Sequence, residues 1–211
     1  MPSNSNFSSI NSNPVSVLEL SSIYLEKIRF HLKELDEEDR LLRFGMFASD
    51  NFVDNYVNSF DFSRDVFFGV FNLDLNLVGF AHLAYCSILK SPSRDAEFGV
   101  SVSTTGRGIG IGTALFKRAA IHCRNSNIDI LHVHCLSTNE GMMHIAKKAG
   151  MLVEKSHGEA EAFLRITPGN HASLIKEALE ANAAIVDYSI KRSVKQGLKI
   201  VKQIYKLPKL V

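Results

Sequence analysis

Four glycines at alternate positions are the part of this chain best suited to bind a ligand. Arg107 stands among them, and the glycines are Gly106, Gly108, Gly110 and Gly112. Because glycine carries no Cβ, a backbone of this composition can approach a ligand closely. The apolar residues beyond Gly110 are spaced as in a helix, and the first amides of a helix attract anions. The sequence therefore predicts a phosphate site near residues 108 to 113, with Arg107 adding a full positive charge.

Two common phosphate-binding loops do not account for this stretch. A Walker A loop needs Gly-Lys followed by Ser or Thr, and no lysine follows any of the four glycines. A dinucleotide fingerprint would need a small residue at Ile111 or Thr113, and no acidic residue ends a strand about 20 residues later. The hexapeptide Arg-Gly-Ile-Gly-Ile-Gly, which starts at Arg107, matches the (Gln/Arg)-x-x-Gly-x-(Gly/Ala) loop of the GCN5-related N-acetyltransferases. The chain resembles that family.

A second motif follows in the order that this family would require. Asn139 precedes a segment with apolar residues on one helical face, and Gly150 can end that helix. The face consists of Met142, Ile145, Ala146 and Ala149. This segment resembles the family's later Asn-x-x-Ala/Met element, so it disfavours the alternative that the glycine run is a turn without a ligand.

The closest resemblance is to the acetyltransferase domain of Pat-type bacterial protein lysine acetyltransferases. It rests on the stretch Ala96 to Val102, on the glycine loop, on the segment from Asn139 to Met151, and on Leu35 to Phe44. The match runs from roughly residue 30 to residue 167. It implies an α/β fold with a mixed, mostly antiparallel central sheet, flanking helices and a splayed strand pair that binds acyl-CoA.

The resemblance also implies acetyl-CoA as the acetyl donor. Main-chain groups of the strand after Glu97 would bind the pantetheine arm, and Asn139 would hold it from the other side. The expected contacts are Val100, Val102, Arg107, Gly108, Ile109, Gly110, Ile111, Gly112, Thr113 and Asn139.

Glu97 is the single expected catalytic residue. An amine acceptor such as lysine is protonated at neutral pH, so acetyl transfer needs a general base. The resemblance assigns that role to Glu97, acting directly or through a water, and an amide of Val100 or Val102 would stabilise the thioester oxygen. We expect Phe80, Phe98 and Phe163 to desolvate Glu97. The alternative is a surface carboxylate at a strand end.

One position departs from the family pattern. Many members carry a tyrosine seven residues after the conserved asparagine, as the acid that protonates the thiolate, whereas this chain has Ala146 there. Solvent, His144, His134 or Tyr85 could replace it. The departure leaves open a CoA-binding module with little catalysis.

No metal site is expected. His132 and His134 share one face of a predicted strand, but further ligands at metal-binding spacing are missing, so packing or substrate contact is the better interpretation. The three cysteines form no CxxC pair and the N-terminus has no apolar signal core, which favours a reducing cytoplasm. The formal net charge of +2 gives no general case for nucleic acid or membrane binding.

The chain divides into three predicted parts. Residues 1–14 form a Ser/Asn-rich tail expected to be disordered, residues 15–167 the acetyltransferase domain, and residues 168–211 a helical extension. Within the domain, residues 17–35 mix strand and helix periods. Two short helices are predicted at 41–47 and 51–60, and strands at 65–72, 75–89, from 96, 128–136, 151–155 and 161–167.

The extension is predicted to form two helices, 172–186 and 188–205. Basic residues of the second stand opposite an apolar face, and Gly197 weakens it by roughly 1 kcal/mol. This helix, 188–206, either packs on the domain or on a second subunit of a homodimer, or it binds an acidic partner, a membrane surface or nucleic acid.

The leading hypothesis is therefore a cytoplasmic N-acetyltransferase that moves an acetyl group from acetyl-CoA to a primary amine. The acceptor could be a protein lysine or a small molecule such as a polyamine, an amino sugar or an amino acid. A CoA-sensing or interaction module with weak turnover is the alternative from a different class.

Overall fold

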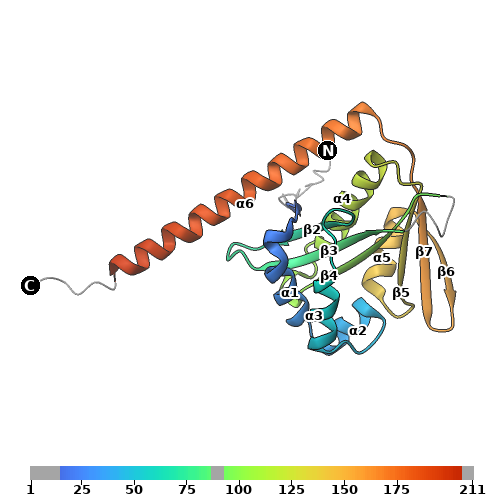
Figure 1. Cartoon of the computed structure of the whole chain (residues 1–211), viewed down its shortest axis with the longest axis horizontal. Coiled ribbons are helices and arrows are strands. Elements are labelled where there is room, and N and C mark those ends of the chain that lie inside the picture. The colour runs from blue at the N-terminus through green and yellow to red at the C-terminus, as the bar shows by residue number, and fades with distance from the viewer. Residues whose placement is uncertain (1–14, 87–92, 206–211) are drawn as a thin grey trace, which may run out of the picture.

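The computed structural model describes residues 15–86 and 93–205 (Figure 1). The tail predicted for residues 1–14, the end of the strand predicted for 75–89 and the last residues of the extension lie outside the described residues. Among the described residues, no helix is long and apolar enough to cross a membrane.

A seven-stranded sheet forms the centre of the described part of the chain. Its order is β1-β2-β3-β4-β5-β7-β6, and only the pair β4 and β5 is parallel. This is the mixed, mostly antiparallel sheet that the family resemblance implied. The strands are β1 Leu18–Glu19, β2 Val66–Phe71, β3 Leu77–Tyr85, β4 Asp95–Val102, β5 Ile130–Leu136, β6 Leu152–Ser156 and β7 Glu159–Arg165.

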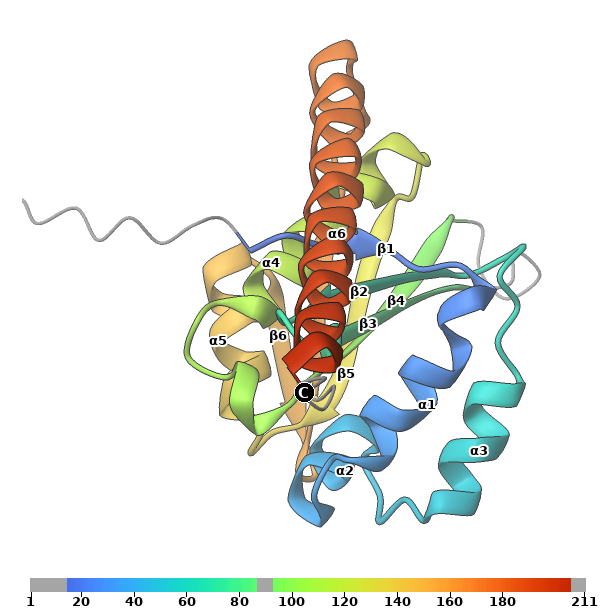
Figure 2. The same cartoon turned by 90° about the vertical axis from the view of Figure 1, so that its left-hand side faces the viewer.

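Helices cover both faces of the sheet (Figure 2). One face carries α1 Leu25–Lys33, α2 Glu37–Phe44 and α3 Asp50–Asn58, and the other carries α4 Ile111–Asn125 and α5 Glu140–Ala149. Two short 3-10 turns, Ser22–Tyr24 and Thr104–Gly106, complete the connections. Because strand side chains alternate between faces, each face buries its own apolar core.

Local signals set the helix boundaries. The Asp36 side chain accepts a hydrogen bond from the amide of Asp39 and so begins α2. Asn139 caps α5 in the same way through the amide of Met142. Gly45 and Gly150 end α2 and α5 with φ of 71° and 70°, a conformation that favours glycine. The predicted stop at Gly150 is therefore confirmed.

The mixed pattern over residues 17–35 has a simple explanation. Strand β1 at Leu18–Glu19 and helix α1 at Leu25–Lys33 follow each other there, separated only by a 3-10 turn. The sequence shows both the strand period and the helix period because it contains a strand and a helix.

The prediction of two C-terminal helices is wrong, because α6 runs without a break from His171 to Tyr205. No glycine or proline interrupts the chain at the expected boundary. Asp187 forms an i,i+4 ion pair with Lys191 at 2.7 Å, and such pairs support a helix. Tyr188 packs against Tyr24 and Phe71, with ring centroids 5.6 and 4.8 Å away.

A buried histidine connects α1 to the sheet. His31 Nδ1 donates to the Leu77 carbonyl and Nε2 accepts from the Ser101 hydroxyl, both at 2.9 Å. Burial lowers the pKa of His31 to about 4, so it is neutral in the folded protein. Unfolded histidine has a pKa near 6.5, so acid favours the unfolded chain as pH falls below that value.

We therefore expect His31 to make the free energy of unfolding fall by about 2 kcal/mol between pH 7 and pH 5. Urea denaturation at both pH values tests this. In His31→Gln the fall should be smaller by that amount, whereas His171→Gln, which changes an exposed histidine, should leave it unchanged. Equal pH dependence in His31→Gln and the wild type would contradict the assignment.

Candidate functional site

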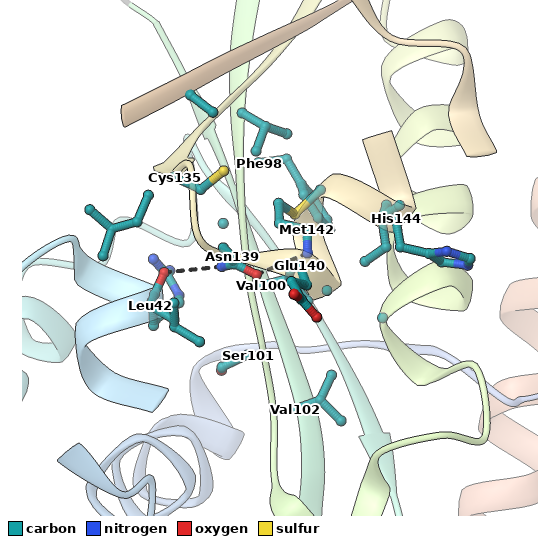
Figure 3. A pocket seen from close by; sticks show the side chains of 18 of the residues that line it. Leu42, Phe98, Val100, Ser101, Val102, Cys135, Asn139, Glu140, Met142 and His144 are labelled. Atoms are coloured by element: carbon teal, nitrogen blue, oxygen red, sulfur yellow. Dashed lines mark hydrogen bonds between the residues drawn. The ribbon is translucent and has the colours of Figure 1, made fainter. Parts of the chain in front are cut away.

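A large cavity opens where β4 and β5 separate (Figure 3). Its volume is about 1440 Å³, and β4, β5, α2, α5 and the glycine loop all contribute to its lining. The two strands pair only at Asp95–Ile130, Ala96–Leu131 and Glu97–His132. Beyond these three pairs β4 stays paired only with β3 and β5 only with β7, and this is the splayed pair that the resemblance implied.

The separation leaves one edge of β4 without a strand partner. The Ser103 amide donates to Val78 of β3, and the Asp95 carbonyl accepts from Cys86 on the same side, both at 2.9 Å. Main-chain groups alternate along a strand, so those of Val100 and Val102 point away from β3, toward the gap. Both residues line the cavity.

The glycine loop presents amides to the same cavity. Gly108 and Gly110 have φ of 78° and 85°, and Gly110 is the N-cap of α4. The first hydrogen bond of α4 runs from the Ala114 amide to the Gly110 carbonyl, so the amides of residues 111–113 have no partner within the helix. The first turn of α4 contains no acidic residue. This terminus has the geometry and the electrostatics of an anion site.

Arg107 also lines the cavity, but it has a partner that sequence inspection missed. Its guanidinium forms an ion pair with Asp39 of α2. Burial raises the pKa of Asp39, and the charge of Arg107 opposes that shift. The charge of Arg107 is therefore shared with a carboxylate that lies 68 residues away in the sequence. Ile109, by contrast, has an exposed side chain and can contribute only its main chain to an inward site.

Asn139 is the N-cap residue of α5 and lies on the opposite side of the gap (Figure 3). Its Oδ1 accepts from the Met142 amide at 2.9 Å, and its Nδ2 donates to the Leu42 carbonyl at 3.4 Å. The side chain thus joins α5 to α2 across the cavity. Its amide group is already engaged at both ends.

Glu97 lies at the last paired position of β4, where the strands begin to separate. Its side chain is 51% exposed, and its Oε1 is 3.6 Å from Nδ1 of His134. The expected desolvation by Phe98 is wrong. Adjacent residues of a strand point to opposite faces, and Phe98 packs against Phe116 of α4 with ring centroids 5.3 Å apart.

Acidic residues and histidines alternate across the face of the sheet that carries Glu97. His134 stands between Glu97 and Glu161, at 3.6 and 3.3 Å. His132 stands between Glu161 and Asp95, at 3.5 and 3.4 Å. Glu154 and Glu159 line the cavity beside them. We call Asp95, Glu97, Glu154, Glu159 and Glu161 the acidic face.

A second residue that sequence inspection missed is Arg43 of α2. Its guanidinium lies so close to Gly99 that a Cβ there would stand 2.7 Å from Nη2. Arg43 forms no ion pair with any described residue, and its buried Nε has no hydrogen-bond partner among them. Arg43 therefore places a positive charge at the wall of this cavity. The sequence around Arg43 contains no signal for this position, because the contact with Gly99 exists only in the folded chain.

A hydrogen-bonded chain fixes Arg43. The guanidinium donates to the Tyr56 hydroxyl, which donates to His82 Nδ1, each at 2.8 Å. His82 Nε2 donates in turn to Asp65 at 3.2 Å. Burial and the nearby Arg43 lower the pKa of His82 to about 4, so this histidine is neutral and adds no charge beside the guanidinium.

The three candidates for the missing acid occupy different places. Ala146 itself is fully buried in the core. His134 and His144 line the cavity, and His144 is exposed. Tyr85 instead shares a hydrogen bond with His122 of α4 at 2.9 Å, so the structure places it apart from the other two.

The histidines of β5 do not form a metal site with their neighbours. Over residues 15–86 and 93–205, no group of three or more histidine, cysteine or acidic side chains has the geometry to hold a metal ion.

Solved structures with this fold come from several acetyltransferases. The GNAT domain of S. lividans PAT is 17% identical, with a TM-score of 0.60 over 71% of this chain and 89% of that domain. Spermidine N-acetyltransferase from Vibrio cholerae, solved with CoA and spermine, is 16% identical, with a TM-score of 0.56 over 72% and 96%. Ribosomal-protein-alanine N-acetyltransferase from Brucella melitensis is 12% identical, with a TM-score of 0.56 over 70% and 96%.

A family model identifies the chain, although a search of curated proteins finds no match. The sequence model of the acetyltransferase (GNAT) family matches residues 30–151, which is more than half of the chain and includes both the glycine loop and the Asn139 motif. The chain therefore belongs to the acetyltransferase (GNAT) family.

Proposed function

We propose that this protein transfers an acetyl group from acetyl-CoA to a primary amine. The observation that carries the proposal is that one cavity joins the amides of the glycine loop to Glu97 along the free edge of β4. An anion site, an unpaired strand edge and a carboxylate thus line one cavity. The first two would bind the phosphates and the arm of an acyl-CoA, and the carboxylate would meet the amine.

The chain offers groups for each part of acetyl-CoA. The amides of residues 108–113, with Arg107, suit the pyrophosphate, and the free main chain at Val100 and Val102 suits the pantetheine amides. Asn139 closes the other side of the gap. Bound there, acetyl-CoA would supply a thioester carbonyl as the acceptor of the amine's electron pair.

Glu97 is the proposed general base. It would take a proton from the acceptor ammonium, directly or through a water, and so free the nitrogen lone pair for attack. An amide of Val100 or Val102 would donate to the thioester oxygen as negative charge develops there. His134, 3.6 Å from Glu97 and half exposed, could pass the accepted proton on toward solvent.

The leaving thiol does not require a buried acid. A thiol has a pKa near 8.5, so its anion is a moderate leaving group that water can protonate. His144 and His134 line the cavity and are the side chains able to assist. Ala146 nevertheless favours one alternative function, a CoA-binding regulatory module with slow turnover.

The acidic face favours a cationic acceptor. Four of its five carboxylates line the cavity, and they would attract a polyamine such as spermidine or a lysine within a basic segment of a protein. Both acceptor classes are consistent with these charges. The location expected for such an enzyme is the cytoplasm.

The donor site is tested by isothermal titration calorimetry with acetyl-CoA and CoA. Gly110→Glu places a carboxylate where the phosphate would bind and should lower affinity at least 100-fold. Gly110→Gln introduces the same backbone strain at φ of 85° without the charge, so it should retain much more affinity. Wild-type protein that binds neither compound would refute the donor assignment.

The base is tested by steady-state kinetics of Glu97→Gln. Loss of a general base should lower kcat by 10²- to 10⁴-fold while the affinity for CoA stays within a few-fold of wild type. Glu154→Gln, which removes another carboxylate of the acidic face, is the control and should leave kcat within a few-fold of wild type, because its effect should fall on KM for a cationic acceptor. Unchanged turnover in Glu97→Gln would remove Glu97 from the mechanism, and CoA binding without any turnover in the wild type would favour the regulatory module.

The acceptor class is tested with paired peptides that contain one lysine flanked by basic or by acidic residues, beside spermidine. We expect kcat/KM to be about 10-fold higher for the cationic acceptors at low salt. Because exposed charges are screened by ions, the difference should shrink at 0.5 M NaCl. A preference for the acidic peptide would contradict an acidic acceptor site.

A further inference from the structure

Helix α6 carries two different faces. One face binds the domain: Ala184 is 2% exposed, Tyr188 packs on Phe71, and Lys191 donates to the Phe71 carbonyl at 2.9 Å. Farther along, Lys195 donates to the Asp74 carbonyl. These contacts fix the direction in which α6 leaves the domain.

The opposite face is apolar and exposed. Its residues follow one another at alternating intervals of four and three, which is the period of a coiled-coil seam. Leu179, Val186, Ile190 and Ile200 are exposed by 57% to 65%. We call this set the α6 stripe, and it consists of Leu179, Ala183, Val186, Ile190, Ser193, Gly197 and Ile200.

Apart from the hydrogen bond of Lys195, the distal half of α6 receives little support from its own domain. Every side chain from Arg192 to Lys202 is exposed, and the helix projects beyond the sheet and its covering helices (Figure 1). A free helix of this length is marginal in water, and Gly197 disfavours it by a further 1 kcal/mol or so. A partner on the stripe would supply the missing stability.

We propose that α6 is a dimerisation element, and that two copies of this chain pair antiparallel through the α6 stripe. The stripe lies opposite the face that binds the domain, so the two domains would stand on opposite sides of the helix pair without colliding. The same surface serves both copies, as a two-fold axis requires.

Charge selects the antiparallel direction. Residues 171–187 carry three acidic residues and one lysine, whereas residues 188–202 carry five basic residues and no acidic one. Antiparallel pairing in the register given below sets residues 178–187, which carry Glu180 and Asp187, beside residues 196–205, which carry Lys199 and Lys202. Parallel pairing would place the two basic halves together, and like charges would oppose it.

Side-chain size selects a register. When Ile190 faces Ser193 of the other copy, Val186 faces Gly197 and Ala183 faces Ile200, so that each large residue meets a small one. A Cβ on Gly197 would meet no atom within 4 Å in the single chain, so room for the opposing valine exists. None of these three pairs sets two large residues against each other.

The contact area predicts a weak dimer. This register overlaps residues 178–205, a helix length of about 42 Å. With a helix diameter of about 12 Å, the pair would bury on the order of 1,000 Å² in total, at the lower end for a specific interface. The dissociation constant should therefore lie in the micromolar range.

Sedimentation velocity of the full chain from 1 to 100 µM is the test. We expect the mass to rise with concentration from 23.4 kDa toward twice that value. Val186→Asp combined with Ile190→Asp should remain monomeric at 100 µM. Leu174→Asp is the matched control, because Leu174 is 50% exposed but lies outside the stripe, and it should dimerise like wild type.

Circular dichroism ensures that the variants are compared as folded proteins. A wild type that is monomeric at 100 µM, or a stripe variant that dimerises normally while folded, would overturn the proposal. So would a monomeric chain that co-sediments with phosphatidylserine vesicles through the same stripe, because a membrane surface would then be the occupant.

Disulfide formation tests the direction of pairing. In a Cys86→Ser background, Ala183→Cys mixed with Ile200→Cys should form a cross-linked dimer under mild oxidation. Ala183→Cys alone should not, because the two positions 183 lie far apart in the antiparallel pair. Efficient cross-linking of Ala183→Cys with itself would indicate parallel pairing and refute the proposed arrangement.

Discussion

The short contact between β4 and β5 is the constraint on which the site depends. Only three residue pairs join these parallel strands, and the last of them includes Glu97. If the pairing continued, the main-chain groups of Val100 and Val102 would form hydrogen bonds with β5 and no gap would exist. Because it ends there, the carboxylate, the free strand edge and the glycine loop open into the same cavity. The seven-stranded sheet fixes both strands firmly enough to keep them apart.

Helix α2 organises the other wall. It supplies Asp39, which pairs with Arg107, and Arg43, which lies on Gly99. Its Leu42 carbonyl accepts from Asn139. Arg43 is in turn positioned by a chain of neutral groups that ends at Asp65, so a positive charge is held beside β4 without a counter-ion among the described residues.

Sequence patterns predicted the elements that have strong local signals. The glycine loop, the Asn139 cap and the Gly150 stop each follow from one or two residues, and the family motifs supplied the fold. The contacts of α2 could not be predicted, because Asp39 and Arg107 are 68 residues apart and no local pattern links them. The surroundings of Glu97 were misjudged because Phe98 is its neighbour in sequence but faces the other side of the sheet. The break assigned near Asp187 failed because helix propensity and tertiary packing agree across it.

A phosphate bound at the glycine loop would disturb the ion pair between Arg107 and Asp39. A phosphate that recruits Arg107 would compete with Asp39, whose buried carboxylate would then lose its counter-ion. The first turn of α2 would have to adjust, and the same helix carries Arg43, which lies against Gly99 in the cavity wall. If the acceptor contacts the same helix, the two ligands would be coupled, and by thermodynamic reciprocity each would alter the affinity of the other by the same factor. The coupling would then pass through a helix of only eight residues.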